Sequence, residues 1–179
     1  MLDLPALSFL PKVLGLLGGV LILANCRQAS DPPASAMPPA PLRLECRLSG
    51  DALTAVRFEL RNPGERPVYA LKWNSPLETP WVGTILAVTR EGTEIPYGGP
   101  MVKRGDPGRD DYVEIPAGGT VSATVDLGQA YDLAASGTYE VRVDHGLFDA
   151  TLDAGEVPRP RERHQALPLS CEGLRLTVP

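Results

Sequence analysis

Apolar and polar residues alternate in five short stretches of this chain. The stretches cover residues 42–48, 56–60, 121–127, 139–143 and 174–178. Successive side chains of a β-strand point to opposite faces of a sheet, so this alternation predicts strands with one buried face. Turn-forming residues lie between stretches, at 62–64, 116–119 and 136–137. Several short strands joined by turns predict an antiparallel β-sandwich, a fold of the all-β class.

Residues 42–179 are predicted to form one immunoglobulin-like domain. Gly137-Thr138-Tyr139 opens one predicted strand and resembles the tyrosine corner of immunoglobulin-like sandwiches, in which a tyrosine hydroxyl bonds to an upstream backbone group. A core tyrosine without that hydrogen bond is the alternative. A short helical turn is expected within residues 127–133. The 19 prolines and 18 glycines of the chain fit a fold with many turns and few long helices.

Residues 1–25 have the features of a signal peptide. Lys12 precedes an uninterrupted apolar stretch, residues 13–24, which is too short to cross a bilayer as a helix. Leu23-Ala24-Asn25-Cys26 follows, and this motif resembles the lipobox of bacterial lipoproteins, whose cysteine carries a diacylglyceryl group and becomes the first residue after cleavage. We therefore expect lipid attachment at Cys26. An ordinary signal peptide, cleaved without lipid, is the alternative.

Residues 26–41 form a proline-rich tether in this interpretation. Such a segment favours extended polyproline II at about 3.1 Å per residue, so about 15 residues span about 45 Å. It would hold the domain clear of a membrane. We expect a lipid-anchored protein of the bacterial cell envelope, and Arg27 after Cys26 favours the outer membrane over the inner one.

The chain has three cysteines, so one remains when two of them pair. A disulfide between Cys46 and Cys171, with lipid on Cys26, accounts for all of them in an exported protein. Closing a loop of about 125 residues stabilises a fold by about 4 to 5 kcal/mol when the lost conformational entropy of the unfolded chain is the cause. Two free buried thiols are the alternative.

The sequence contains no recognisable catalytic arrangement. His145 and His164 are its two histidines, and neither belongs to an HExxH motif or to a cysteine–histidine cluster. We therefore predict no catalytic residue, no metal site and no cofactor, and we expect that the protein is not an enzyme. The formal net charge of -5 also argues against nucleic acid as a partner, because phosphate backbones are bound by clustered Lys and Arg.

Four separated blocks carry a likeness to a known family. They are residues 71–78 (LKWNSPLE), 88–92 (VTREG), 95–105 (IPYGGPMVKRG) and 111–112 (DY). In sequence and in order they resemble the amino-terminal domain of secreted peptidyl-lysine metalloendopeptidases, the deuterolysin-like zinc proteases. The likeness covers about residues 53–145. In that family this domain acts as a pro-region, whereas the zinc ligands and the general base lie in a later domain. None of those catalytic motifs occurs in this sequence, so no active-site residue is carried over.

The resemblance implies a binding role. We expect a partner, a secreted zinc metalloprotease of the deuterolysin-like family, which the domain inhibits or helps to fold. The alternative is a structural or scaffolding envelope lipoprotein with no protease partner. The sequence does not define the oligomeric state.

Residues 95–112 are rich in Pro and Gly and are predicted to form a long exposed loop. Its centre supplies the predicted partner-binding residues, which are Met101, Val102, Lys103 and Arg104. Because the proteases of this family select lysine, Lys103 is a candidate plug for the partner's specificity pocket. The alternative is that Lys103 and Arg104 form a solvated loop tip.

Overall fold

A computed structural model describes residues 41–50 and 54–179 of the chain, and there it is an all-β protein. Ten strands are found in these residues: β1 (Glu45–Gly50), β2 (Ala55–Arg61), β3 (Val68–Leu71), β4 (Leu86–Arg90), β5 (Thr93–Ile95), β6 (Tyr112–Ile115), β7 (Thr120–Asp126), β8 (Gly137–Val143), β9 (Ala150–Thr151) and β10 (Leu174–Val178). Four single 3-10 turns accompany them: η1 (Arg109–Asp111), η2 (Leu127–Gln129), η3 (Ala154–Glu156) and η4 (Arg161–Arg163). In this part of the chain no helix has the length and apolarity needed to cross a membrane.

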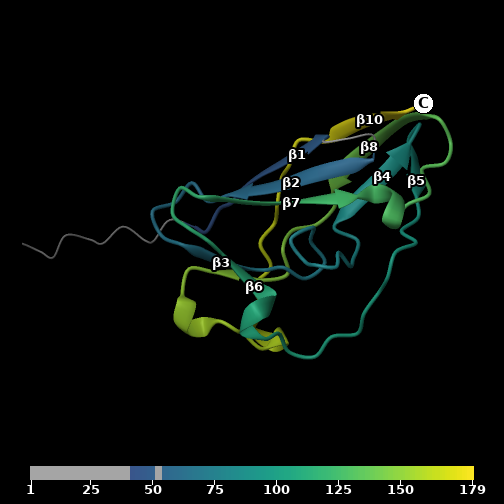
Figure 1. Ribbon diagram of the computed structural model, residues 1–179. Helices are drawn as coiled ribbons and strands as arrows, with labels where there is room; N and C mark the ends of the chain where they lie inside the picture. The colour runs from purple at the N-terminus through teal and green to yellow at the C-terminus, as the bar shows by residue number, and fades with distance from the viewer. Residues whose placement is uncertain (1–40, 51–53) are drawn as a thin grey trace, which may run out of the picture. The chain divides into compact units, whose positions relative to one another are not determined.

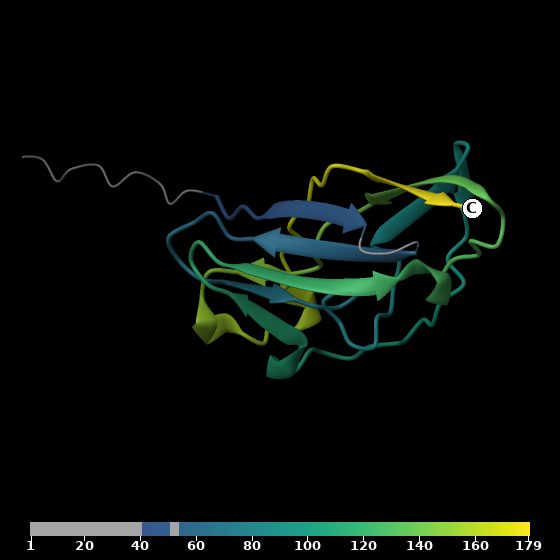
Figure 2. The same cartoon turned by 45° about the horizontal axis from the view of Figure 1, so that its top comes forward.

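The strands form three antiparallel sheets, which Figures 1 and 2 show from two directions. One sheet has the order β1-β2-β7, the second has the order β10-β8-β4-β5, and a small third sheet has the order β6-β3-β9. The first two orders correspond to strands A-B-E and G-F-C-C′ of immunoglobulin-like sandwiches. The predicted antiparallel β-sandwich is therefore confirmed. The predicted signal peptide, Cys26 and nearly all of the tether lie outside the described residues.

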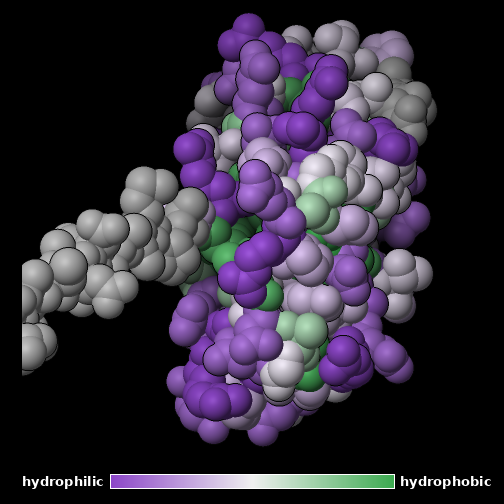
Figure 3. All heavy atoms as spheres, turned by 90° about the vertical axis from the view of Figure 1, so that its left-hand side faces the viewer, coloured by the Kyte–Doolittle hydropathy of each residue, from purple (hydrophilic) through white to green (hydrophobic). Residues whose placement is uncertain are grey.

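The core lies between the sheets and is built by the predicted alternation. In β2, Val56, Phe58 and Leu60 are fully buried, whereas the intervening residues are at least partly exposed. They face buried side chains of the second sheet that include Val88 and Val141. The face of the domain in Figure 3 is largely hydrophilic, with small hydrophobic areas between polar side chains.

The first strand is shorter than the sequence predicts. The alternation starts at Leu42, but β1 begins at Glu45, which is opposite Arg61 at the end of β2. The turn at residues 62–64 then takes β2 away, so residues 42–44 have no neighbouring strand to pair with. Alternation alone does not make a strand, because backbone groups also need a partner.

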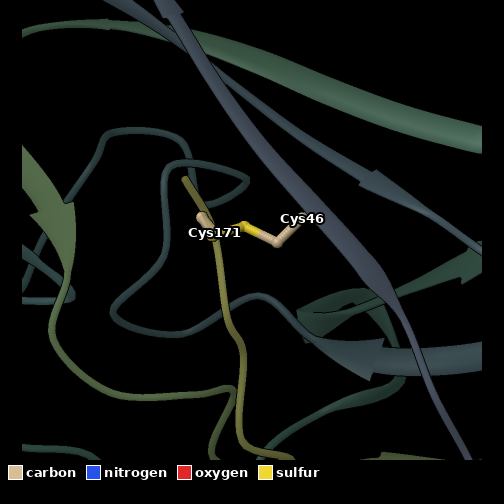
Figure 4. The surroundings of a disulfide bond; sticks show 2 residues. All are labelled: Cys46 and Cys171. Carbon is tan, nitrogen blue, oxygen red and sulfur yellow. A yellow bond between two sulfur atoms is a disulfide. The ribbon is translucent and has the colours of Figure 1, made fainter. Parts of the chain in front are cut away.

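Two predicted covalent and polar links are confirmed. Cys46 of β1 and Cys171, which precedes β10, form a disulfide with their Cα atoms 4.8 Å apart (Figure 4). The Tyr139 hydroxyl donates a 2.7 Å hydrogen bond to the carbonyl of Ala135, which is the tyrosine-corner arrangement. The expected helical turn is present as η2, after β7. The disulfide links the first sheet to the segment that enters the second.

Candidate functional site

A long loop, residues 96–108, connects β5 to the turn η1 that precedes β6 (Figure 1). It contains no strand or helix, as its Pro and Gly content predicts. We define the loop tip as Met101, Val102 and Lys103, three consecutive residues that are all exposed. Met101 is 81% exposed and Val102 is 52% exposed, so two adjacent large apolar side chains lie on the surface here.

The amino-terminal side of the long loop is held by Tyr97. The Tyr97 hydroxyl donates a hydrogen bond to the carbonyl of Pro100 and accepts one from the backbone N–H of Gly83, and both are 2.9 Å long. Gly83 has φ of +117°, and a Cβ there would lie 2.4 Å from the side-chain oxygen of Asn74, so only glycine fits this position. The backbone N–H of Gly98 also donates a 2.7 Å hydrogen bond to the carbonyl of Ala130.

An aromatic cluster fixes the ring of Tyr97. Tyr97 meets Trp81 and Tyr131 edge to face, with ring centroids 6.2 Å and 5.7 Å apart. Burial raises the pKa of Tyr131 to about 12, and its hydroxyl donates to the carbonyl of Leu86 in β4. The start of the long loop is thereby tied to the second sheet.

The carboxy-terminal side of the loop tip is held by Arg104. Its guanidinium forms an ion pair with Glu78 and lies over the ring of Trp73, 4.9 Å from the ring centroid. The side chains of Arg104 and Glu78 are only 20% and 14% exposed. Arg104 therefore points inward and supports the loop, and its predicted part in partner binding stays a prediction.

Arg161 of η4 supports the same stretch of backbone. Its Nη1 donates a 2.9 Å hydrogen bond to the carbonyl of Arg104, and its backbone N–H donates a 3.0 Å hydrogen bond to the carboxylate of Asp106. The long loop is thus fixed to a segment that is distant in sequence.

A buried polar network holds that segment. Asp149 is fully buried and Arg159 is 4% exposed, and they form an ion pair of 3.0 Å. The Asp149 carboxylate also accepts a 2.7 Å hydrogen bond from the hydroxyl of Tyr112 in β6 and a 2.8 Å hydrogen bond from the backbone N–H of Gln165. Glu156 neutralises the other side of the guanidinium at 2.7 Å. Burial and the hydrogen bond to Asp149 raise the pKa of Tyr112 far above its ordinary value.

Beside the loop tip is a surface hollow of about 870 Å³. The residues that line the hollow include Trp73, Val102, Lys103, Phe148, Arg161 and Glu162. Trp73 is nearly buried at 6% exposure, whereas Phe148 is 40% exposed. The hollow therefore combines aromatic surface with charged groups, a composition typical of binding surfaces.

The two neighbouring cations of the long loop have opposite environments. Arg104 is paired, as described above. Lys103 is exposed, and within residues 41–50 and 54–179 its ammonium has no hydrogen bond or ion pair. Lys103 is therefore the cation at the tip that is available to a partner.

The histidines have ordinary local contacts. His145 lies 3.3 Å from the carboxylate of the adjacent Asp144, and His164 contacts the carbonyl of Arg159 at 3.2 Å. Among the described residues, no three His, Cys, Asp or Glu side chains gather in a way that could hold a metal ion. The arrangement of exposed apolar and cationic side chains favours contact with another macromolecule.

Comparison with known proteins adds one likeness. No family model matches the chain. A stretch of 87 residues is 33% identical to a protein described as an extracellular protease of Aeromonas hydrophila. The stretch covers 49% of this chain and 25% of that protein, so the chain is similar to about a quarter of the protease's length. This similarity is consistent with a protease-related domain.

The structure brings together some predicted residues and adds others. Cys46 and Cys171 are joined, and the loop tip is exposed where the sequence places it. Cys26 lies outside the described residues. The supporting residues Trp73 and Glu78 were not predicted from the sequence as part of the site.

Proposed function

We propose that this chain is a non-enzymatic exported lipoprotein whose sandwich binds a secreted zinc protease of the deuterolysin-like family. Binding would inhibit the protease or assist its folding. The similarity to part of an extracellular protease supports a protease-related role. The observation that carries the proposal is the loop tip, which presents apolar residues and an unpaired Lys103 between two well-held ends.

The geometry suits recognition because the tip is ordered before it meets a partner. Tyr97 fixes the backbone on one side and Arg104 fixes it on the other. A loop that is already in its bound conformation loses less conformational entropy on binding. In this proposal Lys103 enters an acidic pocket of the protease as a lysine of a substrate would.

The role can be tested with a peptidyl-lysine metalloendopeptidase and the full-length protein in mild detergent. An inhibitor lowers the initial rate of peptide cleavage at stoichiometric concentration. A folding partner leaves that rate unchanged but raises the yield of active protease recovered from denaturant. Absence of both effects would contradict the proposal and favour the alternative, a structural or scaffolding lipoprotein of the envelope.

The proposed location rests on the motif that ends at Cys26. We propose that Cys26 carries lipid and anchors the protein in the bacterial envelope. The outer membrane is the favoured location over the inner membrane. Replacing Cys26 by Ser should move the protein from the detergent-soluble membrane fraction to the soluble fraction and remove the mass of the acyl chains. Retention of Cys26→Ser in the membrane would contradict the lipid attachment.

A further inference from the structure

The two lysines of the described residues, Lys72 and Lys103, have different backbone environments. Lys72 follows β3, its side chain is partly buried, and its backbone N–H donates a 2.8 Å hydrogen bond to the carbonyl of Asp111. Lys103 is exposed and lies in the loop tip, outside any strand or 3-10 turn. Exposed loop tips are preferred sites of proteolytic cutting. In this part of the chain a lysine-selective protease therefore meets one open site.

The peptide bond between Val102 and Lys103 is the accessible bond of that site. Arg104 is held by its ion pair with Glu78, and its carbonyl accepts a 2.9 Å hydrogen bond from Arg161. The bond that follows Lys103 therefore ends at a fixed residue. The bond that precedes Lys103 joins two exposed residues of the loop tip. Hydrolysis is thus easiest between Val102 and Lys103.

Both new chain ends would stay held after a cut at this bond. The Tyr97 hydroxyl donates a 2.9 Å hydrogen bond to the carbonyl of Pro100 on one side, and the ion pair of Arg104 holds the other side. Neither contact involves the peptide bond that is cut. The new carboxylate and the new amine would therefore remain close together, at a high effective concentration.

The sandwich joins the two halves of the chain across the same cut. β2 pairs with β7 in the first sheet, β4 pairs with β8 in the second, and β3 pairs with β6 and β9 in the third. Each of these pairs links a strand that precedes the long loop to one that follows it. The disulfide between Cys46 and Cys171 adds a covalent link (Figure 4). A domain cut at the loop tip would remain one folded molecule.

We infer that the bond between Val102 and Lys103 is a reversible cleavage site, so that the domain inhibits a lysine-selective protease in both its intact and its cut form. Hydrolysis consumes one water: the C–N bond breaks, the water oxygen joins the carbonyl carbon of Val102, and its proton joins the nitrogen of Lys103. In the reverse step the amine of Lys103 attacks the carboxyl carbon of Val102 and water is released. Because the ends do not separate, this step is effectively intramolecular, and the two forms coexist. The inference rests on the proposed function and specifies it as inhibition.

The test is incubation of the full-length protein, in mild detergent, with a catalytic amount of a peptidyl-lysine metalloendopeptidase. The intact mass should rise by one water, and a fragment covering residues 103–179 should separate only after reduction of the disulfide. The ratio of cut to intact protein should settle between about 0.1 and 10, from either starting form. The isolated cut form should inhibit within about threefold of the intact form, because its loop ends are already ordered.

Tyr97→Phe tests the contribution of the held ends. It removes the hydroxyl that bonds to Pro100 and keeps the ring that packs on Trp81 and Tyr131. The cut form of this variant should inhibit about fivefold less well than the wild-type cut form, and the ratio of cut to intact protein should rise by a similar factor. Tyr69→Phe is the matched control, because it removes a tyrosine hydroxyl from β3 and leaves the loop contacts in place. Circular dichroism would check that both variants are folded, and a Tyr97→Phe variant that behaves like the wild type would overturn the holding role of the hydroxyl.

The outcomes separate the inference from the proposed function. Inhibition together with a stable ratio of the two forms supports the inference. Inhibition without cleavage, complete conversion to the cut form, or a cut form that inhibits more than about tenfold less well overturns the inference and leaves the proposed function standing. A raised yield of refolded protease without inhibition has the same meaning. Neither inhibition nor assisted folding, with or without cleavage, overturns both.

Discussion

The sandwich and the long loop are held in place by different means. In the sandwich, β2 is paired on both sides, with β1 and β7, and its inward residues Phe58 and Leu60 are fully buried. The long loop pairs with no strand, and its position depends on a few side chains, chiefly Tyr97 and Arg104. The domain thus separates the residues that stabilise it from the residues that it presents.

This difference predicts two classes of variant. A change in the sandwich or in the network beneath the loop should lower the free energy of unfolding. A change at the loop tip should leave that free energy within about 0.5 kcal/mol and alter binding alone. The following experiments examine the separation, from the largest expected effect to the smallest.

Loss of the disulfide should have the largest effect. The Cys46→Ser, Cys171→Ser double variant is expected to lose about 4 to 5 kcal/mol of unfolding free energy, because the bridge closes a loop with a sequence separation of 125 residues. Urea unfolding of the oxidised protein, the reduced protein and the variant would measure this loss. The reduced protein should match the variant, and a loss below about 1 kcal/mol would show that the bridge has little effect on stability.

Removal of the buried carboxylate should be nearly as costly. Asp149→Ala is expected to lower the unfolding free energy by about 3 to 5 kcal/mol, because it leaves the buried Arg159 with Glu156 as its one ionic partner in the network and removes the acceptor of the Tyr112 hydroxyl. The double variant Asp149→Leu, Arg159→Met should lose less than Asp149→Ala, since neither charge is then buried. Equal losses in a urea titration would indicate that packing, and not the loss of the buried ion pair, explains the cost.

Loss of the tip cation should affect binding and not stability. Lys103→Ala is expected to weaken binding to a peptidyl-lysine metalloendopeptidase by about 2 to 4 kcal/mol if the ammonium is desolvated and paired there. The matched control is Arg47→Ala, which removes one exposed cation from β1. Inhibition constants would compare the two variants. Equal potency of Lys103→Ala and the wild type would exclude the plug.

Weakening one support of the loop should have the smallest effect. Glu78→Gln removes the charge opposite Arg104 but keeps the side-chain volume, and we expect a stability loss of about 1 kcal/mol. Hydrogen exchange should become faster near the loop tip and stay unchanged in β2. Glu78→Asp should restore part of the protection. Unchanged exchange at the tip would mean that Tyr97 and Trp73 hold the loop without the ion pair.

The sequence predicts the strands that have one face in the core. In β2 and β8 the buried residues alternate with exposed or partly exposed ones, so their pattern is visible. In β3 and β4 buried residues also stand next to one another, and the alternation that would indicate a strand is lost. The two residues of β9 are too few to form any pattern. These three strands, and the short β5 and β6, were found only in the structure.

The candidate site likewise has a part that the sequence predicts and a part that only the fold brings together. Pro and Gly residues predict that Met101 to Lys103 lie in an exposed loop. The sequence cannot distinguish Lys103 from Arg104, because the inward position of Arg104 depends on Trp73 and Glu78 from another segment. The hollow has the same origin, since Phe148 and Arg161 reach it only through the fold.

The ties on both sides of the loop tip make its three side chains interchangeable. Tyr97 bonds to the backbone of Pro100, and Arg161 bonds to the backbone of Arg104, so neither contact depends on the identity of residues 101–103. New side chains could be grafted there without a redesign of the scaffold. The sandwich is thus a ready frame for displaying short peptide sequences, and a library at these three positions would yield domains of altered specificity with the same stability.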